Sequence, residues 1–347
     1  MRAVVLTDGR LELTDLPDPV PAEGEVLVDV LACGICGTDL HCVRHGEELN
    51  EAMRNARGVG AFDLTRPIVL GHEFVGRVIA HGPGTTGRIR TGSRVVSVPA
   101  SGRPDRAPIG FAGPETPGGL AERMVLSEKL LIEVPDHVPT ELAALTEPLA
   151  VAHHAVARGD LGTEDVPLVV GCGPIGLAVV AVLRTRGAGP IIAADFSPER
   201  RALAKALGAD VVVDPATASP YAAWADAAIA DGRRARPTVA FECVGAPGVI
   251  GRIVAGAPAR SRIVVAGLCM TPDVLEPAQA VLKELELRFA MMYSVAEFAE
   301  TFELLAEGAF DVAPLITRTV GLADVPGVFE SLASSPADAK VLVDPMR

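Results

Sequence analysis

The hydrophobic pattern changes once along the chain, and the change predicts two domains. In the first part, short β-rich runs are separated by turns in which Pro and Gly recur. These runs occupy residues 3–6, 25–32, 68–79, 94–98, 121–126 and 130–134. Such punctuation is typical of short antiparallel strands and not of long helices. We therefore expect an irregular, barrel-like β domain.

From Val166 onward, short apolar strands alternate with helical segments. The expected strands are 166–170, 190–195, 210–213, 238–243, 262–267 and 285–291. One helix is expected just before this part, at 142–157, and others at 177–186, 198–207, 294–308 and 325–333. Alternation of this kind indicates a doubly wound parallel sheet in an α/β protein. The last helices and a final strand at 340–343 are expected to return to the first domain.

Composition excludes some classes of partner. The chain has 347 residues, of which 49% are hydrophobic, and it carries a formal charge of -13. A surface this acidic repels nucleic acids and anionic membranes, so neither is an expected partner. The longest apolar runs, such as 177–183, are too short to span a bilayer. Six unpatterned cysteines and a first strand near Met1 instead of a signal peptide indicate a cytoplasmic protein.

The segment from Cys33 to His41, Cys-Gly-Ile-Cys-Gly-Thr-Asp-Leu-His, combines a thiol, a hydroxyl, a carboxylate and an imidazole on a glycine-rich backbone. Gly71-His72-Glu73 follows about thirty residues later. The CxxC spacing also fits a redox pair or half of a four-cysteine zinc knot. However, the other cysteines are scattered singly, and a thioredoxin-like context is missing. We interpret the segment as half of a catalytic zinc site.

A second motif, Gly-Cys-Gly-Pro-Ile-Gly at residues 171–176, lies between a buried strand and a helix. An acid, Asp195, ends the next strand, which is the context of a dinucleotide-binding turn. The glycines allow a tight turn, close approach to the pyrophosphate and close packing, while the helix amino terminus offers N–H donors. Asp195 favours NAD over NADP, although an arginine such as Arg200 can accommodate a phosphate. The predicted cofactor-binding residues are Gly171, Gly173, Pro174, Ile175, Gly176, Asp195 and Arg200.

Together these motifs resemble the zinc-containing medium-chain alcohol dehydrogenases over essentially the whole chain, and most of all their polyol, butanediol and threonine dehydrogenase branch. Residues 33–41, 71–76, 146–151 and 171–176 and Asp195 carry the resemblance. It implies a GroES-like zinc-binding catalytic domain made of residues 1–148 and 292–347. It also implies a Rossmann NAD-binding domain made of residues 149–291.

The resemblance also implies roles for single residues. Cys36, and not Cys33, is the first zinc ligand and His72 the second, while Glu73 and Glu147 compete for the remaining places. A thiolate, an imidazole and one carboxylate leave a bound zinc ion formally neutral, and a second carboxylate adds a negative charge. Thr38 is expected to take the proton of the alcohol, which His41 passes on to solvent.

Two departures from the family pattern matter. Residues 99–118 correspond to a lobe that holds a structural zinc in some relatives, but they contain no cysteine, so we expect one catalytic zinc per subunit and no structural zinc. The insertion at 42–66 is long for the family, and it is expected either to border the pocket or to form a surface helix.

The expected activity is reversible hydride transfer between a secondary alcohol or polyol and NAD. The alternatives are an inactive nicotinamide-binding regulatory protein and a zinc-free quinone or enoyl reductase of the same superfamily. The resemblance implies a homodimer, formed through the edge strand at 285–291, or a homotetramer. The sequence does not identify the substrate.

Overall fold

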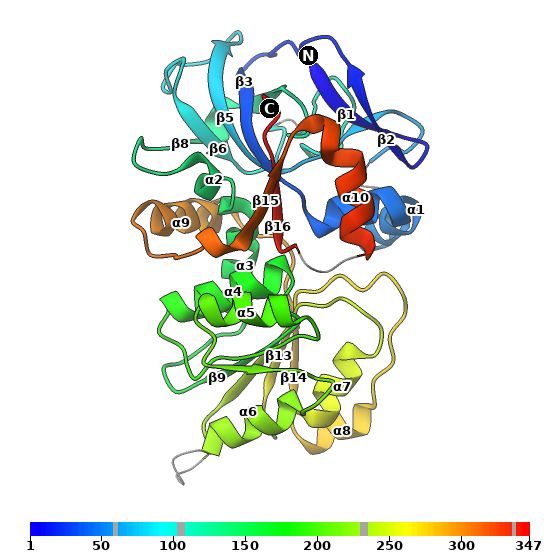
Figure 1. The fold of residues 1–347 in the computed structure, drawn as a ribbon, viewed down its shortest axis with the longest axis vertical. Coiled ribbons are helices and arrows are strands. Elements are labelled where there is room, and N and C mark those ends of the chain that lie inside the picture. The colour runs from blue at the N-terminus through cyan, green and yellow to red at the C-terminus, as the bar shows by residue number, and fades with distance from the viewer. Residues whose placement is uncertain (58–61, 103–107, 230–234, 335–337) are drawn as a thin grey trace. The chain divides into compact units, whose positions relative to one another are not determined.

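The computed structural model describes residues 1–57, 62–102, 108–229, 235–334 and 338–347. The chain forms two compact units (Figure 1). The first unit consists of Met1–Glu147 and Ile316–Arg347, and the second of Pro148–Leu315.

The first unit is rich in β-structure. Its three-stranded sheet has the order β2-β1-β4, and its seven-stranded sheet follows the path β15-β16-β3-β5-β6-β8, with β7 also paired to β3. The strands are β1 (Arg2–Thr7), β2 (Arg10–Asp15), β3 (Glu25–Gly34), β4 (Ile68–Val69), β5 (Glu73–His81), β6 (Arg94–Ser97), β7 (Arg123–Ser127), β8 (Leu131–Glu133), β15 (Ile316–Val320) and β16 (Lys340–Val343). Its helices are α1 (Gly37–Arg57), α2 (Thr140–Ala143) and α10 (Val325–Ser334), with short 3-10 turns at η1 (Glu128–Leu130) and η3 (Leu322–Asp324).

Strand β3 organises this unit because it pairs with three others. Along β3 buried positions recur at every second residue, as expected for a strand with one face on a core. The register places Gly34 opposite both Glu73 of β5 and Leu342 of β16. Three segments from distant parts of the sequence therefore meet at the end of β3 (Figure 1).

The expected single strand at 68–79 is divided in the structure into β4 and β5. The division falls at Gly71, whose φ of +101° is outside the strand region and is readily adopted only by glycine. A Cβ on Gly71 would lie 2.7 Å from the Leu120 backbone nitrogen and 2.8 Å from Cys33 Sγ. Gly71 thus lets the chain turn closely past Cys33 just before His72.

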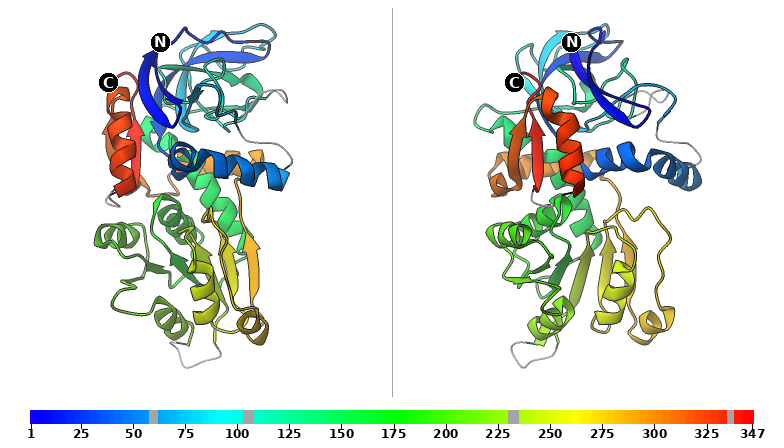
Figure 2. Two further views of the ribbon diagram at one scale, coloured as in Figure 1. Left: turned by 90° about the vertical axis from the view of Figure 1, so that its right-hand side faces the viewer. Right: turned by 45° about the vertical axis from the view of Figure 1, so that its right-hand side comes forward.

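The second unit is a six-stranded parallel sheet with the order β11-β10-β9-β12-β13-β14. Helices lie on both faces of the sheet, which confirms the expected doubly wound α/β fold (Figures 1 and 2). The strands are β9 (Val166–Val170), β10 (Ile192–Ala194), β11 (Val211–Val213), β12 (Thr238–Glu242), β13 (Arg262–Val265) and β14 (Glu286–Phe289). The helices are α3 (Thr146–Arg158, which starts in the first unit), α4 (Pro174–Thr185), α5 (Pro198–Ala206), α6 (Pro220–Ile229), α7 (Val249–Gly256), α8 (Pro277–Leu282) and α9 (Val295–Ala306), and a 3-10 turn η2 follows at Ala313–Leu315.

The chain returns to the first unit at Ile316, later than the residue 292 suggested by the sequence. Helix α9 belongs to the second unit, where Glu297 Oε1 lies 2.8 Å from His154 Nδ1 of α3. A polar contact between two amphipathic helices cannot be recognised from the periodicity of either helix alone. Two strands of the structure, β2 and β15, were not expected from the sequence.

Candidate functional site

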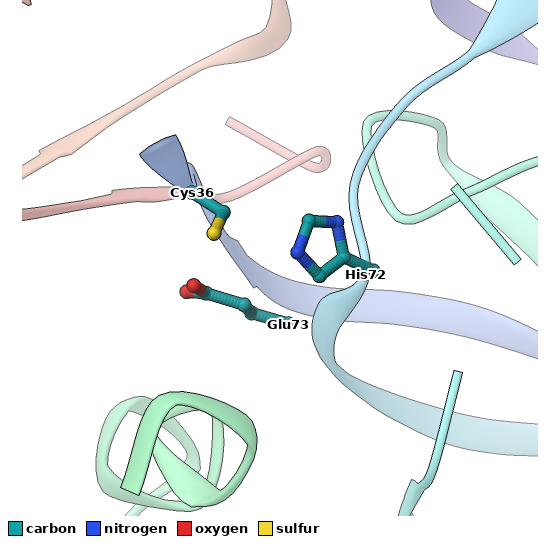
Figure 3. A group of neighbouring side chains, drawn as sticks. All are labelled: Cys36, His72 and Glu73. Carbon is teal, nitrogen blue, oxygen red and sulfur yellow. The ribbon is translucent and has the colours of Figure 1, made fainter. Parts of the chain in front are cut away.

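Cys36, His72 and Glu73 meet in the first unit. One potential ligand atom from each, a sulfur, a ring nitrogen and a carboxylate oxygen, lies within 4.8 Å of the other two. The three side chains point toward one another (Figure 3). Cys36 comes shortly after the end of β3, Glu73 is the first residue of β5, and His72 immediately precedes it. The antiparallel pairing of β3 with β5 therefore brings together residues that the sequence separates.

Asp39 contacts two of these residues: the backbone of Cys36 and the side chain of His72. It lies in the first turn of α1 and is completely buried. Its Oδ2 accepts a hydrogen bond of 2.9 Å from the Cys36 backbone N–H, and its Oδ1 lies 3.3 Å from His72 Nδ1. Burial alone would lower the pKa of His72, but Asp39 and Cys36 raise it well above the ordinary value. Asp39 therefore fixes the orientation of the His72 ring.

The two cysteines of the CxxC pair have different environments. Cys33 is completely buried, and burial raises the pKa of its thiol well above the ordinary value. Its sulfur faces the Gly34 carbonyl oxygen at 3.5 Å. Cys36 is partly exposed and belongs to the three-residue cluster. This arrangement supports Cys36 as the ligand and Cys33 as a packing residue.

These donors suit a zinc ion. Thiolate, imidazole and carboxylate are the ligand types of zinc sites in proteins, and a set of three leaves one position open. Because His72 Nδ1 faces Asp39 Oδ1 at 3.3 Å, the other ring nitrogen, Nε2, is the one left for a metal ion.

Glu147 has a less direct relation to the cluster. It lies in the first turn of α3, is 9% exposed, and is outside the group that meets within 4.8 Å. Its charge nevertheless acts on Lys340, a direct neighbour of Glu73. The expected competition between Glu73 and Glu147 for the metal stays a prediction.

Lys340 is the residue of this site that sequence reasoning missed. It starts β16, is 2% exposed, and its Nζ lies 2.7 Å and 2.6 Å from the two carboxylate oxygens of Glu73. The Nζ also donates to the Ile35 carbonyl oxygen at 3.1 Å. Burial would lower the pKa of Lys340, but the charges of Glu73 and Cys36 raise it above the ordinary value. In the sequence Lys340 is one charge before an apolar strand, and nothing local marks its partner.

Both residues of the expected proton relay lie on α1, and Thr38 is next to the cluster. Thr38 Oγ1 lies 3.7 Å from Cys36 Sγ. The His41 ring centroid lies 6.2 Å from that of His45. Burial, together with the charges of His45 and Arg44, lowers the pKa of His41. A histidine with a lowered pKa is mostly neutral at physiological pH, so it can accept a proton there.

The insertion at 42–66 reaches the site through an aromatic stack. Phe111 stacks on the His72 ring at a centroid distance of 5.3 Å and on Phe62 at 5.9 Å. Asn50 of α1 holds Phe62 in place, since its side-chain amide donates to the Phe62 carbonyl oxygen at 2.7 Å. The described part of the insertion is therefore more than a solvated surface helix. In the loop at 99–118, residues 103–107 lie outside the described chain.

The glycine-rich turn of the second unit connects β9 to α4. Gly171 has a φ of +91°, and a Cβ on Gly176 would collide with the Gly171 carbonyl oxygen. Nothing lies within 4 Å of the position of a Cβ on Gly173, which leaves that side of the turn open. Pro174 is the first residue of α4, and the free N–H groups that follow form an anion-binding helix start.

Asp195 is hydrogen-bonded to this turn. Its Oδ2 accepts a hydrogen bond of 2.8 Å from the Cys172 N–H, and its Oδ1 accepts one of 2.8 Å from the Ser197 N–H. Arg201 pairs with Asp214 at 3.2 Å. Within the described residues Arg200 Nε is buried and has no hydrogen-bond partner. The acid and the arginine considered in the sequence thus lie close to the turn, and Arg200 keeps a donor available.

The second unit has a parallel sheet with a dinucleotide-binding turn, and the β-rich first unit brings potential metal ligands together. The combination of these two units in one chain is typical of one class of enzymes. Proteins of this class are nicotinamide-dependent dehydrogenases that use a metal ion.

Comparison with known proteins agrees with this class. The chain belongs to the zinc-binding dehydrogenases: residues 174–307 match the model of the zinc-binding dehydrogenase domain, and residues 22–136 match that of the alcohol dehydrogenase GroES-like domain. It is 32% identical to the (R,R)-butanediol dehydrogenase of Neisseria gonorrhoeae, over 97% of each chain. It is 30% identical to the sorbitol dehydrogenase of Gallus gallus, over 95% of this chain and 92% of that one.

Solved structures show the same relationship. The crystal structure of 2R,3R-butanediol dehydrogenase from Bacillus subtilis superposes with a TM-score of 0.84, at 29% identity and over 99% of both chains. The expected family, its polyol and butanediol branch and the expected fold class are confirmed. The protein is a zinc-dependent alcohol or polyol dehydrogenase with zinc and NAD as cofactors, and the two alternative functions lose their support.

Proposed function

We propose that this protein oxidises a secondary alcohol, within a diol or a longer polyol, to the ketone, and catalyses the reverse reduction. The observation that carries the proposal is the convergence of Cys36, His72 and Glu73 within 4.8 Å. Relatives named butanediol and sorbitol dehydrogenases support the substrate class, since both names denote polyols.

Each residue has a distinct task in this proposal. Cys36 and His72 hold the metal, and Glu73 or Glu147 completes its coordination. A bound zinc ion lowers the pKa of a substrate hydroxyl, and bound NAD accepts the hydride. Thr38 accepts the hydroxyl proton and His41 delivers it to solvent. A neutral His41 suits this step, because it must take up a proton before releasing it.

In the second unit, the glycine turn and Asp195 serve the dinucleotide. Gly171, Gly173 and Gly176 let the backbone approach the pyrophosphate, while Pro174 and Ile175 start the helix that supplies N–H donors. The Asp195 carboxylate binds the ribose hydroxyls of NAD and repels a 2'-phosphate. Arg200 follows in the first turn of α5, and its charge acts on Cys172 of the glycine turn.

The experiment is an assay of NADH formation with a panel of secondary alcohols, vicinal diols and polyols. It is repeated after removal of the metal with a chelator and again after zinc is restored. We expect turnover of at least one member, loss of activity in the metal-free protein, and recovery with zinc. Absence of turnover across the panel in zinc-loaded protein, or full activity without metal, would contradict the proposal.

We also propose that the protein forms a homodimer or homotetramer through β14. This strand is at the end of its sheet, where it pairs with β13 on one side only in the described chain. Leu287, Phe289 and Met291 on and after it are 38%, 63% and 52% exposed. An apolar edge strand of this kind calls for a partner.

We place the protein in the cytoplasm. All six cysteines are free thiols, which fits a reducing compartment. Within the described residues, no helix is both long and apolar enough to cross a membrane.

A further inference from the structure

The pair formed by Lys340 and Glu73 is more than a structural ion pair. Lys340 is 2% exposed and Glu73 is completely buried. A buried ammonium group is costly unless a negative charge and hydrogen bonds compensate its lost hydration. Both oxygens of Glu73 and the Ile35 carbonyl oxygen provide this compensation, so all three donor positions of the ammonium have acceptors.

The ion pair of Lys340 and Glu73 has room because Gly34 carries no side chain. Gly34 faces Glu73 across the β3–β5 ladder, and a Cβ on Gly34 would collide with Glu73 Oε2. Strand β16 pairs with β3 at the same point, with Leu342 opposite Gly34, which brings Lys340 close from the other side. Gly34 therefore allows the carboxylate to lie against the end of β3, where the ammonium reaches it.

The same carboxylate is one of the three groups that could bind the metal. An oxygen of Glu73 lies within 4.8 Å of ligand atoms on both Cys36 and His72. Two cations thus compete for Glu73: a fixed ammonium group and a metal ion. Every contact that Glu73 keeps with Lys340 directs lone pairs of its oxygens away from the metal position.

The charges around the metal position also indicate that Lys340 affects metal binding. Cys36, Glu73 and Glu147 bring three negative charges, against two positive charges on a zinc ion. Lys340 supplies the third positive charge, and Cys36, Glu73 and Glu147 all act on it electrostatically. Asp39 adds one more negative charge beside His72, so the assembly with Lys340 is one unit negative, and without it two units negative.

We propose that Lys340 is a positioning residue that holds Glu73 partly away from the zinc ion and lowers the affinity of the site for zinc. Glu73 is then an exchangeable ligand, and a coordination position stays accessible to the substrate. Without Lys340, Glu73 binds the metal permanently and the more negative site holds zinc more tightly. This inference rests on the zinc site proposed above.

The test compares the zinc dissociation constant of the wild-type protein with that of the Lys340→Met variant, by competition with a chromophoric chelator. We expect the variant to bind zinc about tenfold more tightly or better, given the Coulomb energy between charges a few Å apart. X-ray absorption at the zinc edge is expected to show one more oxygen ligand. Because Glu73 then competes with the substrate for its coordination position, KM should rise by a larger factor than kcat falls.

Two control variants and the sign of the effect make the result specific. Lys340→Arg keeps the positive charge and should retain wild-type zinc affinity to within about threefold. Lys129→Met removes an exposed lysine from the same unit and should change nothing. Damage to the fold would weaken zinc binding, which is opposite in sign to the expected effect. Equal or weaker zinc binding by Lys340→Met therefore overturns the inference.

If the Lys340→Met variant does not fold, a second pair of variants tests the same inference. Glu73→Gln leaves Lys340 buried beside the metal, and the Glu73→Gln/Lys340→Met double variant removes both charges. The double variant should bind zinc about tenfold more tightly than Glu73→Gln, and equal affinity would refute the role of the Lys340 charge. Failure of the wild-type protein to bind zinc would instead refute the zinc site itself, so the two failures are distinguishable.

Discussion

Asp39 Oδ1 lies 3.3 Å from His72 Nδ1 in the interior of the first unit, and the other Asp39 oxygen accepts a hydrogen bond from the Cys36 N–H. One buried carboxylate therefore fixes the orientation of one proposed ligand side chain and the backbone of another proposed ligand. Such a contact orients an imidazole and raises its basicity toward a metal.

We expect Asp39→Asn to weaken zinc binding about 10- to 100-fold, the range typical of lost contacts behind a metal ligand. The Asn side chain has the same shape but carries no charge to stabilise the ring. Zinc affinity is measured by chelator competition, with Asp15→Asn, a change of an exposed acid in the same unit, as the control. Unchanged affinity in Asp39→Asn would show that the Asp39 charge does not act on the metal.

The Asp195 carboxylate should determine the choice between NAD and NADP. We expect Asp195→Asn to lower kcat/KM for NAD about tenfold or more and to raise kcat/KM for NADP, because the repulsion of the 2'-phosphate disappears. Asn keeps an acceptor for one of the two N–H groups that Asp195 holds. Steady-state kinetics with both cofactors provide the measurement.

Arg200 provides the matched control, because its Nε is buried near the turn without a hydrogen-bond partner in the described structure. Adding Arg200→Gln to Asp195→Asn should abolish the gain with NADP while leaving kcat/KM for NAD nearly unchanged. If NADP activity persists in the double variant, another group binds the phosphate.

The β14 edge is expected to hold subunits together. Phe289→Glu places a charge at a 63% exposed apolar position of the edge strand, so it should dissociate the oligomer. Sedimentation velocity of the wild-type and variant proteins at equal concentration measures this. Val20→Glu, at an 83% exposed apolar position in the other unit, is the control and should leave the sedimentation coefficient unchanged. A monomeric wild-type protein would contradict the proposed assembly.

The sequence predicts local features well and long-range pairings poorly. Cys36, His72 and the glycine turn were found because their signals lie within a few consecutive residues. The pairing of Lys340 with Glu73 joins residues separated by 267 positions, and the register of β16 on β3 that creates it leaves no local trace. For the same reason the turn at Gly71 was not distinguished from the expected strand at 68–79. The close approach of Leu120, which requires a glycine there, is a contact between distant parts of the sequence.

The start of α9 is expected to make the stability of the second unit depend on pH. Glu297 Oε2 accepts the Ser294 N–H at 2.7 Å, Ser294 Oγ accepts the Glu297 N–H at 3.2 Å, and Glu297 Oε1 lies 2.8 Å from His154 Nδ1. Burial alone would raise the pKa of Glu297, but the Ser294 and His154 contacts outweigh it and lower the pKa to about 2. An ordinary glutamate in the unfolded chain titrates near about 4.3.

A lowered pKa in the folded state means that the Glu297 charge stabilises the fold above the unfolded pKa, and that this contribution is lost as pH falls toward about 2. Glu297→Gln keeps an acceptor for the cap but removes the charge. We expect the variant to melt about 2–4 °C below wild type at pH ~7, with the difference roughly halved by pH ~3. Glu303→Gln, an exposed position of α9, is the control and should melt like wild type at both pH values. A melting difference that stays constant between these pH values would mean that Glu297 stabilises α9 through its shape and not through its charge.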